Sequence, residues 1–287
     1  MDSLSLISSL VAVLMVAFIG AWGAKKLHQP ILTGYLLAGL LATTFFGRFV
    51  HFANAQVLAD LGLAFLMFVI GLEFSVRRLT RVRKIAVFGG IAQMIFTILL
   101  IGCLSYLGHL GNLIEIIILG TVFSLSSTAI VVKIISERGE LDTLPSEIIV
   151  GWLLIQDLAV VPILSILAVV VAGGTASAIV SGVAISFVKS AVLLYLVLIL
   201  GKKIIPKLLT KVAEIGSREV LLICVVGLVL LSASVTSYFG LSFALGAFLA
   251  GLLVSESVTQ HAIFSEIRPL RDVFAVIFFV TLGVLVS

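Results

Sequence analysis

The chain has 287 residues, of which 61% are hydrophobic and 11% are charged, and its formal net charge is +4. This is more apolar surface than a soluble core can bury, which excludes an ordinary soluble globular domain. The apolar runs have about the length that a helix needs to cross a bilayer, roughly 20 residues, and they lack the alternating pattern of a barrel strand. We therefore predict an all-α integral membrane protein.

Ten membrane spans are predicted. In chain order they cover residues 5–24, 31–47, 56–75, 85–107, 113–134, 147–172, 177–200, 218–236, 239–256 and 270–287. The first run has no basic segment before it and no clear cleavage pattern, so we interpret it as a retained helix and not as a signal peptide. Because Cys103 and Cys224 fall in separate apolar runs, neither a disulfide nor a metal site is expected.

The basic residues predict the orientation. Arg48 lies on one side of the predicted spans and Lys189 within the seventh span, whereas sixteen of the 18 lysines and arginines lie on the opposite side. These sixteen are Lys25, Lys26, Arg77, Arg78, Arg81, Arg83, Lys84, Lys133, Arg138, Lys202, Lys203, Lys207, Lys211, Arg218, Arg268 and Arg271. The positive-inside rule makes their side cytoplasmic, with the amino terminus outside a cell inner (plasma) membrane. The net charge thus reflects topology and not a nucleic-acid partner.

An internal repeat is visible in the sequence. "GYLLAGLL" at Gly34 recurs as "GAFLAGLL" at Gly246, an offset of 212 residues that also pairs Gly71 with Gly283. Common small-residue packing motifs are the alternative explanation. If six spans form one unit and the seventh is a linker, the second unit is inserted upside down, as in many secondary transporters.

The repeat predicts three segments. They are a first six-span repeat at residues 1–172, a linker helix at 173–212, and the first three spans of a second repeat at 213–287. Completing the second repeat would take about one hundred residues beyond Ser287, so we expect the chain to be truncated. The offset also pairs Asp60 with Asp272. We expect both carboxylates at helix amino termini, which favour negative charge.

Hydroxyl side chains cluster in the fifth span. The stretch "GTVFSLSSTAIVVK", residues 120–133, contains Ser124, Ser126, Ser127 and Thr128 near its middle. Hydroxyls can satisfy backbone groups where a helix unwinds, and a helix broken at mid-membrane can hold an ion through freed carbonyls. An intact helix with satisfied hydroxyls is the alternative.

Asp157 lies in the apolar stretch "LLIQDLAVVPIL", residues 153–164. A carboxylate there is costly, so it is expected to be neutralised, paired or functional. Its depth matches that of the hydroxyl cluster, which predicts a shared site near the midplane. Gln156 can add an uncharged oxygen, and Pro162 can kink the helix. Lys189 either pairs with a carboxylate or has a structural role. No enzyme motif is present, so no catalytic residue is expected.

The sequence resembles the monovalent cation:proton antiporter family, in particular its Kef-type potassium/proton branch. The stretches that carry the resemblance are "FVIGLEFSVRRL", "LSSTAIVVKIISERGEL", "LLIQDLAVVPIL", "LGAFLAGLLVSES" and "HAIFSEIRPLRDVFAVIFFVTLGV". The resemblance implies thirteen helices in two inverted six-helix units. It also implies two crossed broken helices in a core domain that moves against a dimerisation domain, and hence a homodimer.

The resemblance also implies roles for individual residues. It puts "LSSTAI" on the first broken helix and makes Asp157 the residue that binds proton and cation in turn. Electrogenic sodium/proton relatives have an aspartate where this chain has Gln156, so the glutamine implies electroneutral exchange and potassium. Kef-type members carry a cytoplasmic nucleotide-binding regulatory domain or subunit. Two departures are "ATTFFG" in place of the Gly-Pro turn after the second span, and a second broken helix that would lie beyond Ser287.

The sequence therefore predicts a secondary transporter that exchanges a monovalent cation, K⁺, for H⁺ by alternating access. The predicted ligands are Asp157, Gln156, Ser126, Ser127 and Thr128, with Ser124, Pro162 and Lys189 in supporting positions. No cofactor is expected in the chain itself; a nucleotide would need a regulatory domain. The alternatives are a Na⁺/H⁺ antiporter, a channel-like conductance, an organic-anion carrier of the same fold, and a truncated non-transporting membrane subunit.

Overall fold

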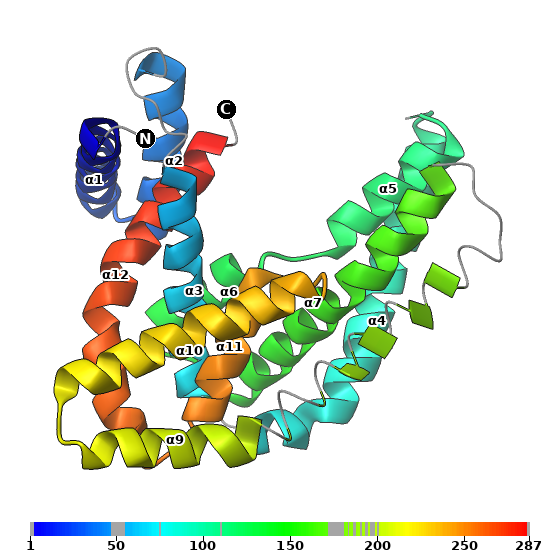
Figure 1. The fold of residues 1–287 in the computed structure, drawn as a ribbon. Helices are drawn as coiled ribbons and strands as arrows, with labels where there is room; N and C mark the ends of the chain where they lie inside the picture. Colours follow the sequence, from blue (N-terminus) through cyan, green and yellow to red (C-terminus); the bar gives the residue numbers. More distant parts are fainter. Residues whose placement is uncertain are drawn as a thin grey trace. The chain divides into compact units, whose positions relative to one another are not determined.

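The computed structural model describes residues 3–46, 55–74, 76–109, 111–171 and 201–285, together with residues 181, 182, 184, 185, 188, 189, 191, 192, 195 and 199. Regular structure in these residues is helical, which confirms the all-α prediction (Figure 1). Most of the predicted span at 177–200 lies outside the described residues. The chain forms two compact units, one made of Met1–Val69 and His261–Ser287 and the other of Ile70–Gln260.

The first unit combines helices from both ends of the chain. Its helices are α1 (Ser3–Lys26), α2 (Ile31–Phe46), most of α3 (Ala55–Glu73) and α12 (Gln260–Leu285). Val13 and Ala17 of α1 pack with Ile277 and Val280 of α12 in a buried cluster. The two ends of the sequence therefore share one apolar core.

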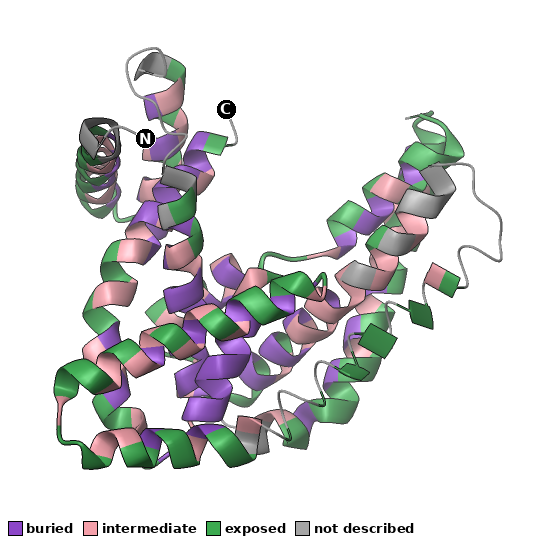
Figure 2. Cartoon of the chain, viewed as in Figure 1, coloured by how far each residue is buried: buried purple, intermediate pink, exposed green. Residues whose placement is uncertain are grey.

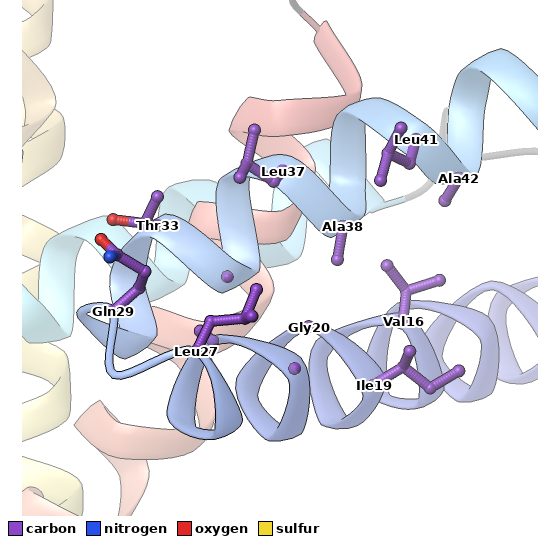
Figure 3. Close-up of a pocket in the computed structure, with 13 residues that line it drawn as sticks. Val16, Ile19, Gly20, Leu27, Gln29, Thr33, Leu37, Ala38, Leu41 and Ala42 are labelled. Atoms are coloured by element: carbon purple, nitrogen blue, oxygen red, sulfur yellow. The ribbon is translucent and has the colours of Figure 1, made fainter.

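A groove of about 380 Å³ separates α1 from α2 (Figure 3). Glycine, alanine and larger aliphatic residues line most of it, and Gln29 and Thr33 are the polar side chains at one end. The helices approach closely at Gly20 and Gly34, where a Cβ on either glycine would collide with the carbonyl of the other. Small residues thus set the spacing of this helix pair, as is common between membrane helices.

The second unit contains the remaining helices. They are α4 (Val76–Leu107), α5 (Leu113–Ser124), α6 (Thr128–Glu137), α7 (Leu144–Val171), α9 (Lys202–Glu214), α10 (Arg218–Tyr238) and α11 (Phe243–Val254). Helix α4 packs against both α5 and α7, and α10 packs against α11 and α9. Figure 2 shows α11 buried along nearly its whole length, and every residue from 245 to 254 is buried.

Helix α9 was not expected as a separate element. Its lysines Lys203 and Lys207 are exposed, whereas Ile205 and Leu209 are buried. This is the pattern of an amphipathic helix, although Ile204 and Leu208 are exposed as well. The linker predicted at 173–212 therefore includes an amphipathic segment near its end.

Two helix crossings, one in each unit, match at the offset of 212 residues. In the first unit, a Cβ on Gly283 of α12 would collide with the carbonyl of Leu36 and lie 3.1 Å from the backbone nitrogen of Leu40. In the second unit, a Cβ on Gly71 of α3 would collide with the carbonyl of Phe248 and lie 3.0 Å from the backbone nitrogen of Leu252. Adding 212 to the first member of each pair gives the second: Leu36 and Phe248, Leu40 and Leu252, Gly71 and Gly283.

A second pair of crossings follows the same offset. A Cβ on Gly34 would collide with the carbonyl of Gly20, and a Cβ on Gly246 would meet the carbonyl of Ser232. Where α1 has Gly20, α10 has Ser232, whose hydroxyl donates a 2.7 Å hydrogen bond to the carbonyl of Gly246. Thus α1 and α2 pack in the same register as α10 and α11.

Five helical segments among the described residues are long and apolar enough to cross a membrane. They are Ile7–Lys26, Leu79–Leu107, Leu113–Glu137, Leu144–Leu164 and Arg218–Tyr238. Ile31–Thr44 and Phe243–Val254 are apolar but shorter. The 12 residues of α11 rise only about 18 Å, less than the roughly 30 Å of a bilayer core. The count of ten spans and the inverted repeat therefore stay predictions.

The predicted positions of Asp60 and Asp272 at helix amino termini are wrong. Helix α12 begins at Gln260 and not near residue 270, so Asp272 lies well inside it and pairs with Arg271 at 2.8 Å. Asp60 lies in the second turn of α3, which begins at Ala55. The error has a physical reason, because hydropathy marks where a helix becomes apolar and not where its hydrogen bonding begins.

Candidate functional site

The fifth predicted span is an interrupted helix. Helix α5 ends at Ser124, α6 begins at Thr128, and the three residues between them are not helical (Figure 1). Leu125 is extended, with φ −94° and ψ 135°, and so is Ser127, with φ −73° and ψ 109°. Of the two alternatives that the hydroxyl cluster left open, the structure has the break.

Two hydroxyls of the cluster serve the backbone on either side of the break. The Ser127 hydroxyl oxygen caps α6 and accepts from the backbone N–H of Ile130 at 3.4 Å. Ser124 is fully buried, and its hydroxyl donates to the carbonyl of Thr121 at 2.7 Å. These bonds satisfy groups that a helix terminus leaves without an intrahelical partner.

Close packing of α4 on α7 brings polar side chains together behind the break. A Cβ on Gly151 would lie 2.6 Å from the Cβ of Ala86, and a Cβ on Gly89 would lie 2.7 Å from the indole nitrogen of Trp152. The same indole nitrogen donates to the carbonyl of Ile85 at 3.1 Å. One to two turns further along these faces, Gln93 of α4 meets Gln156 of α7.

Gln156 joins the break to α4. Its side chain is only 3% exposed; Oε1 accepts from the backbone N–H of Ser126 at 2.9 Å, and Nε2 donates to Oε1 of Gln93 at 2.8 Å. Nε2 of Gln93 in turn donates to the carbonyl of Ser124 at 3.3 Å and to the hydroxyl of Thr97 at 3.2 Å. The predicted role of Gln156 as a cation ligand stays a prediction.

Gln93 was missed by the sequence reasoning. It is an uncharged side chain in the middle of the apolar run "IAQMIF" and precedes Thr97 by one helical turn. An amide inside a predicted membrane span needs hydrogen-bond partners, and this requirement could have marked Gln93 as a candidate site residue. Nothing in the sequence identified those partners.

Asp157 faces the first residue of α6. The hydroxyl of Thr128 lies 3.3 Å from Oδ1 and 3.2 Å from Oδ2 of Asp157. Both residues are half-buried, and within the described part of the chain Asp157 has no ion-pair partner. A carboxylate that is partly removed from water and bonded only to a hydroxyl can accept a proton or a cation.

The structure brings together most of the predicted site residues. Ser124, Ser126 and Gln156 belong to one hydrogen-bonded group with Gln93. Thr128 and Asp157 form a separate contact beside it, since Asp157 follows Gln156 on α7. Ser126 and Ser127 are exposed at the break. Pro162 lies within α7, which continues to Val171, so the proline does not end the helix. Lys189 is exposed. The binding roles of all these residues stay predictions.

The arrangement offers oxygen atoms and one negative charge. Hydroxyl, carbonyl and carboxylate oxygens are the ligands that replace the hydration shell of a hard monovalent cation. Gln156 beside Asp157 is neutral, so a second carboxylate does not occupy that position. The chemistry that fits is reversible binding of a proton or a cation.

Comparison with known proteins identifies a family and several relatives. Residues 13–287 match the family model described as sodium/hydrogen exchanger, transmembrane. The candidate cation/proton antiporter YbaL of Escherichia coli (strain K12) is 37% identical over 290 residues, which cover 98% of this chain and 51% of YbaL. The K(+) efflux antiporter 4 of Arabidopsis thaliana is 35% identical over 291 residues, 99% of this chain and 48% of that protein.

A further relative is the glutathione-regulated potassium-efflux system protein KefC of Klebsiella pneumoniae subsp. pneumoniae. It is 34% identical over 284 residues, which cover 99% of this chain and 45% of KefC. The chain thus spans about half the length of these three relatives.

Proposed function

Because this chain belongs to the sodium/hydrogen exchanger family of membrane cation/proton antiporters, we propose that it carries the ion site of a secondary transporter that exchanges K⁺ for H⁺. The observation that carries the proposal is the contact of Asp157 with Thr128 beside the break between α5 and α6. K⁺ is proposed over Na⁺ because relatives at 34–35% identity are named for potassium efflux.

Proton and cation compete for the carboxylate of Asp157. A bound cation stabilises the charged carboxylate, and a bound proton removes the charge, so each state excludes the other. With one titrating group, the occupied site carries the same net charge in both states. Exchange is therefore one for one and electroneutral.

The break supplies the remaining ligands. Ser126 and Ser127 are exposed there, and Thr128 already touches the carboxylate. Their hydroxyls and the freed carbonyls replace part of the hydration shell of the cation. Alternating access then arises from movement of one helix bundle around the site.

The chain has an inverted repeat in which α1, α2 and α3 correspond to α10, α11 and α12. The matched crossings support this proposal, because Gly283 packs on α2 as Gly71 packs on α11. A common offset for the glycines and for their partners favours a repeat over a chance similarity of small-residue motifs.

The protein has its amino terminus outside and its basic side in the cytoplasm of a cell inner membrane, a proposal that the sixteen basic residues on one side support. The protein works as a homodimer, and a cytoplasmic nucleotide-binding domain or subunit regulates it. These partners rest on the Kef-type resemblance.

The test is cation-driven proton movement in proteoliposomes that contain the full-length protein and a pH-sensitive dye. Addition of K⁺ is expected to move protons in the wild type and in Glu214→Gln, an acid-to-amide control on the exposed end of α9. Asp157→Asn is expected to abolish the signal. Retained exchange in Asp157→Asn would contradict the competition mechanism.

Two further arms address the alternatives. A larger response to Na⁺ than to K⁺ would favour a sodium exchanger. Current without proton movement would indicate a channel-like conductance. The exchange rate is also measured at several clamped membrane potentials, and a voltage dependence equivalent to one net charge per cycle would contradict electroneutrality. Absence of transport of any cation would leave a non-transporting subunit.

A further inference from the structure

We infer that Gln93 is a positioning residue for the proposed exchange, and that it acts through Gln156 to hold the helix break open in front of Asp157. In this arrangement the Gln156 amide serves the backbone of the break and not the cation. The expected effect on transport rests on the proposed function, whereas the expected effect on the stability of the break rests on the hydrogen bonds alone.

Three hydrogen bonds form a ring that connects the two edges of the break through Gln156 and Gln93. The N–H of Ser126 donates to Oε1 of Gln156 at 2.9 Å, and Nε2 of Gln156 donates to Oε1 of Gln93 at 2.8 Å. Nε2 of Gln93 donates to the carbonyl of Ser124 at 3.3 Å. The ring begins and ends on backbone groups two residues apart, and these are groups that the interrupted helix cannot satisfy itself.

The backbone fixes the direction of both amides. The N–H of Ser126 can only donate, so it requires the oxygen of Gln156; the carbonyl of Ser124 can only accept, so it requires the nitrogen of Gln93. The remaining nitrogen and oxygen then face each other between the two side chains. A single rotation of either amide would leave two donors or two acceptors in contact, and the ring has no second arrangement.

An ionised carboxylate cannot replace either glutamine. At position 93 it would accept from Gln156 but could not donate to the carbonyl of Ser124, and at position 156 it would accept from Ser126 but could not donate to Gln93. Ser124 is fully buried and Gln156 is 3% exposed, so water has little access to repair the loss. The packing of α4 on α7 therefore requires neutrality beside Asp157.

The ring also sets the distance between Thr128 and Asp157. Ser126 and Thr128 are two residues apart on the break, and Gln156 and Asp157 are adjacent on α7. Because Gln156 holds Ser126 in place, Thr128 is held within 3.2 Å of the carboxylate. Gln93 donates to Ser124 and accepts from Gln156, so it acts on the contact of Thr128 with Asp157 through Gln156.

The first test uses transport. Gln93→Leu is expected to raise the half-saturating K⁺ concentration by about tenfold or more, since several bonds at the break are lost together. The double variant Gln93→Leu with Gln156→Leu is expected to be no worse than the poorer single variant, because one substitution already opens the ring. Gln29→Leu, the same change outside the site, is the control. Unchanged K⁺ dependence in Gln93→Leu, or additive effects in the double variant, would overturn the inference.

A second variant gives a signature that general damage would not produce. In Gln93→Glu, the protonated acid can accept from Gln156 and donate to Ser124, whereas the ionised form cannot donate. The polar groups that face Gln93 from α5 and α7 are the neutral Ser124 and Gln156. The variant is expected to lose activity relative to the wild type as pH rises, and Gln29→Glu is expected to keep the wild-type profile. A wild-type profile in Gln93→Glu would count against the ring.

The third test does not depend on transport. Amide hydrogen exchange of the peptide that contains residues 125–127 is expected to be about tenfold or more faster in Gln93→Leu than in the wild type or Gln29→Leu. Exchange in α10 reports whether the variant has folded. Unchanged protection of residues 125–127 in a folded Gln93→Leu variant would overturn the inference. If the wild type shows no transport but Gln93→Leu still speeds amide exchange at 125–127, only the proposed function fails.

Discussion

The single hydroxyl of Thr128 contacts both carboxylate oxygens of Asp157, at 3.3 Å and 3.2 Å, from across the gap between two helices. It is the direct link between the broken helix and the carboxylate. A hydrogen bond to a charged group contributes about 1.5–3 kcal/mol, which is enough to affect ion binding measurably.

Removal of this hydroxyl is expected to weaken cation binding. In Thr128→Val the half-saturating cation concentration should rise about tenfold or more, because the charged carboxylate loses its hydrogen-bond donor. Thr128→Ser should stay within about threefold of the wild type, because it keeps the hydroxyl. Thr44→Val, which removes a hydroxyl bonded to its own helix at Leu40, is the matched control. Equal behaviour of the Val and Ser variants would contradict a role for the hydroxyl.

Competition at Asp157 also predicts a pH dependence with a definite sign. As pH falls, more of the carboxyl groups carry a proton, so more cation is needed to displace it. The half-saturating cation concentration should rise by up to about tenfold per pH unit on the acidic side. The measurement is the initial exchange rate against cation concentration at several values of equal internal and external pH. A half-saturating concentration independent of pH would indicate that cation and proton bind at different places.

The amino-terminal cap of α6 is expected to hold the second edge of the break. Ser127→Ala removes the acceptor for the N–H of Ile130 and should destabilise the first turn of α6 by about 1 kcal/mol. Amide exchange in the peptide 128–132 should therefore be about fivefold faster. Ser127→Asn, which preserves a capping oxygen, should restore protection. Ser126→Ala is the comparison, since it keeps the backbone N–H that Gln156 binds.

The matched helix crossings predict matched sensitivity to added bulk. Gly71→Ala and Gly283→Ala each force a methyl group against a backbone carbonyl, at a cost of about 1–3 kcal/mol. Both variants should melt several degrees below the wild type in detergent. Gly23→Ala and Gly227→Ala are the controls, because a Cβ on either glycine has no neighbour within 4 Å. If Gly71→Ala and Gly283→Ala had the same melting temperature as the controls, the close approach at these glycines would not contribute to stability.

The sequence predicted the helical class, most helix positions and the family. Long apolar runs determine where helices form, and the resemblance to the cation:proton antiporter family is confirmed by the match over residues 13–287. The start of α12 at Gln260 was missed because Arg268, Arg271 and Asp272 lower hydropathy without interrupting backbone hydrogen bonds.

The sequence alone could not decide whether the fifth predicted span is broken. Hydroxyl side chains permit both an intact helix and a broken one, and the choice depends on partners for the peptide groups of Ser124 and Ser126. Those partners come from Gln93, 31 residues before Ser124, and from Gln156, 30 residues after Ser126. Only the packing of α4 and α7 brings both amides to the break.

The unit built from Met1–Val69 and His261–Ser287 has a consequence for synthesis of the protein. The core of Val13, Ala17, Ile277 and Val280 cannot form until α12 has been made. The ribosome must add the 191 residues 70–260 before it reaches His261, which takes about 10 to 40 s at roughly 5–20 residues per second. During that interval Val13 and Ala17 lack the α12 side chains that they pack against in the finished protein. Assembly of this core is therefore a late step in the synthesis of the chain.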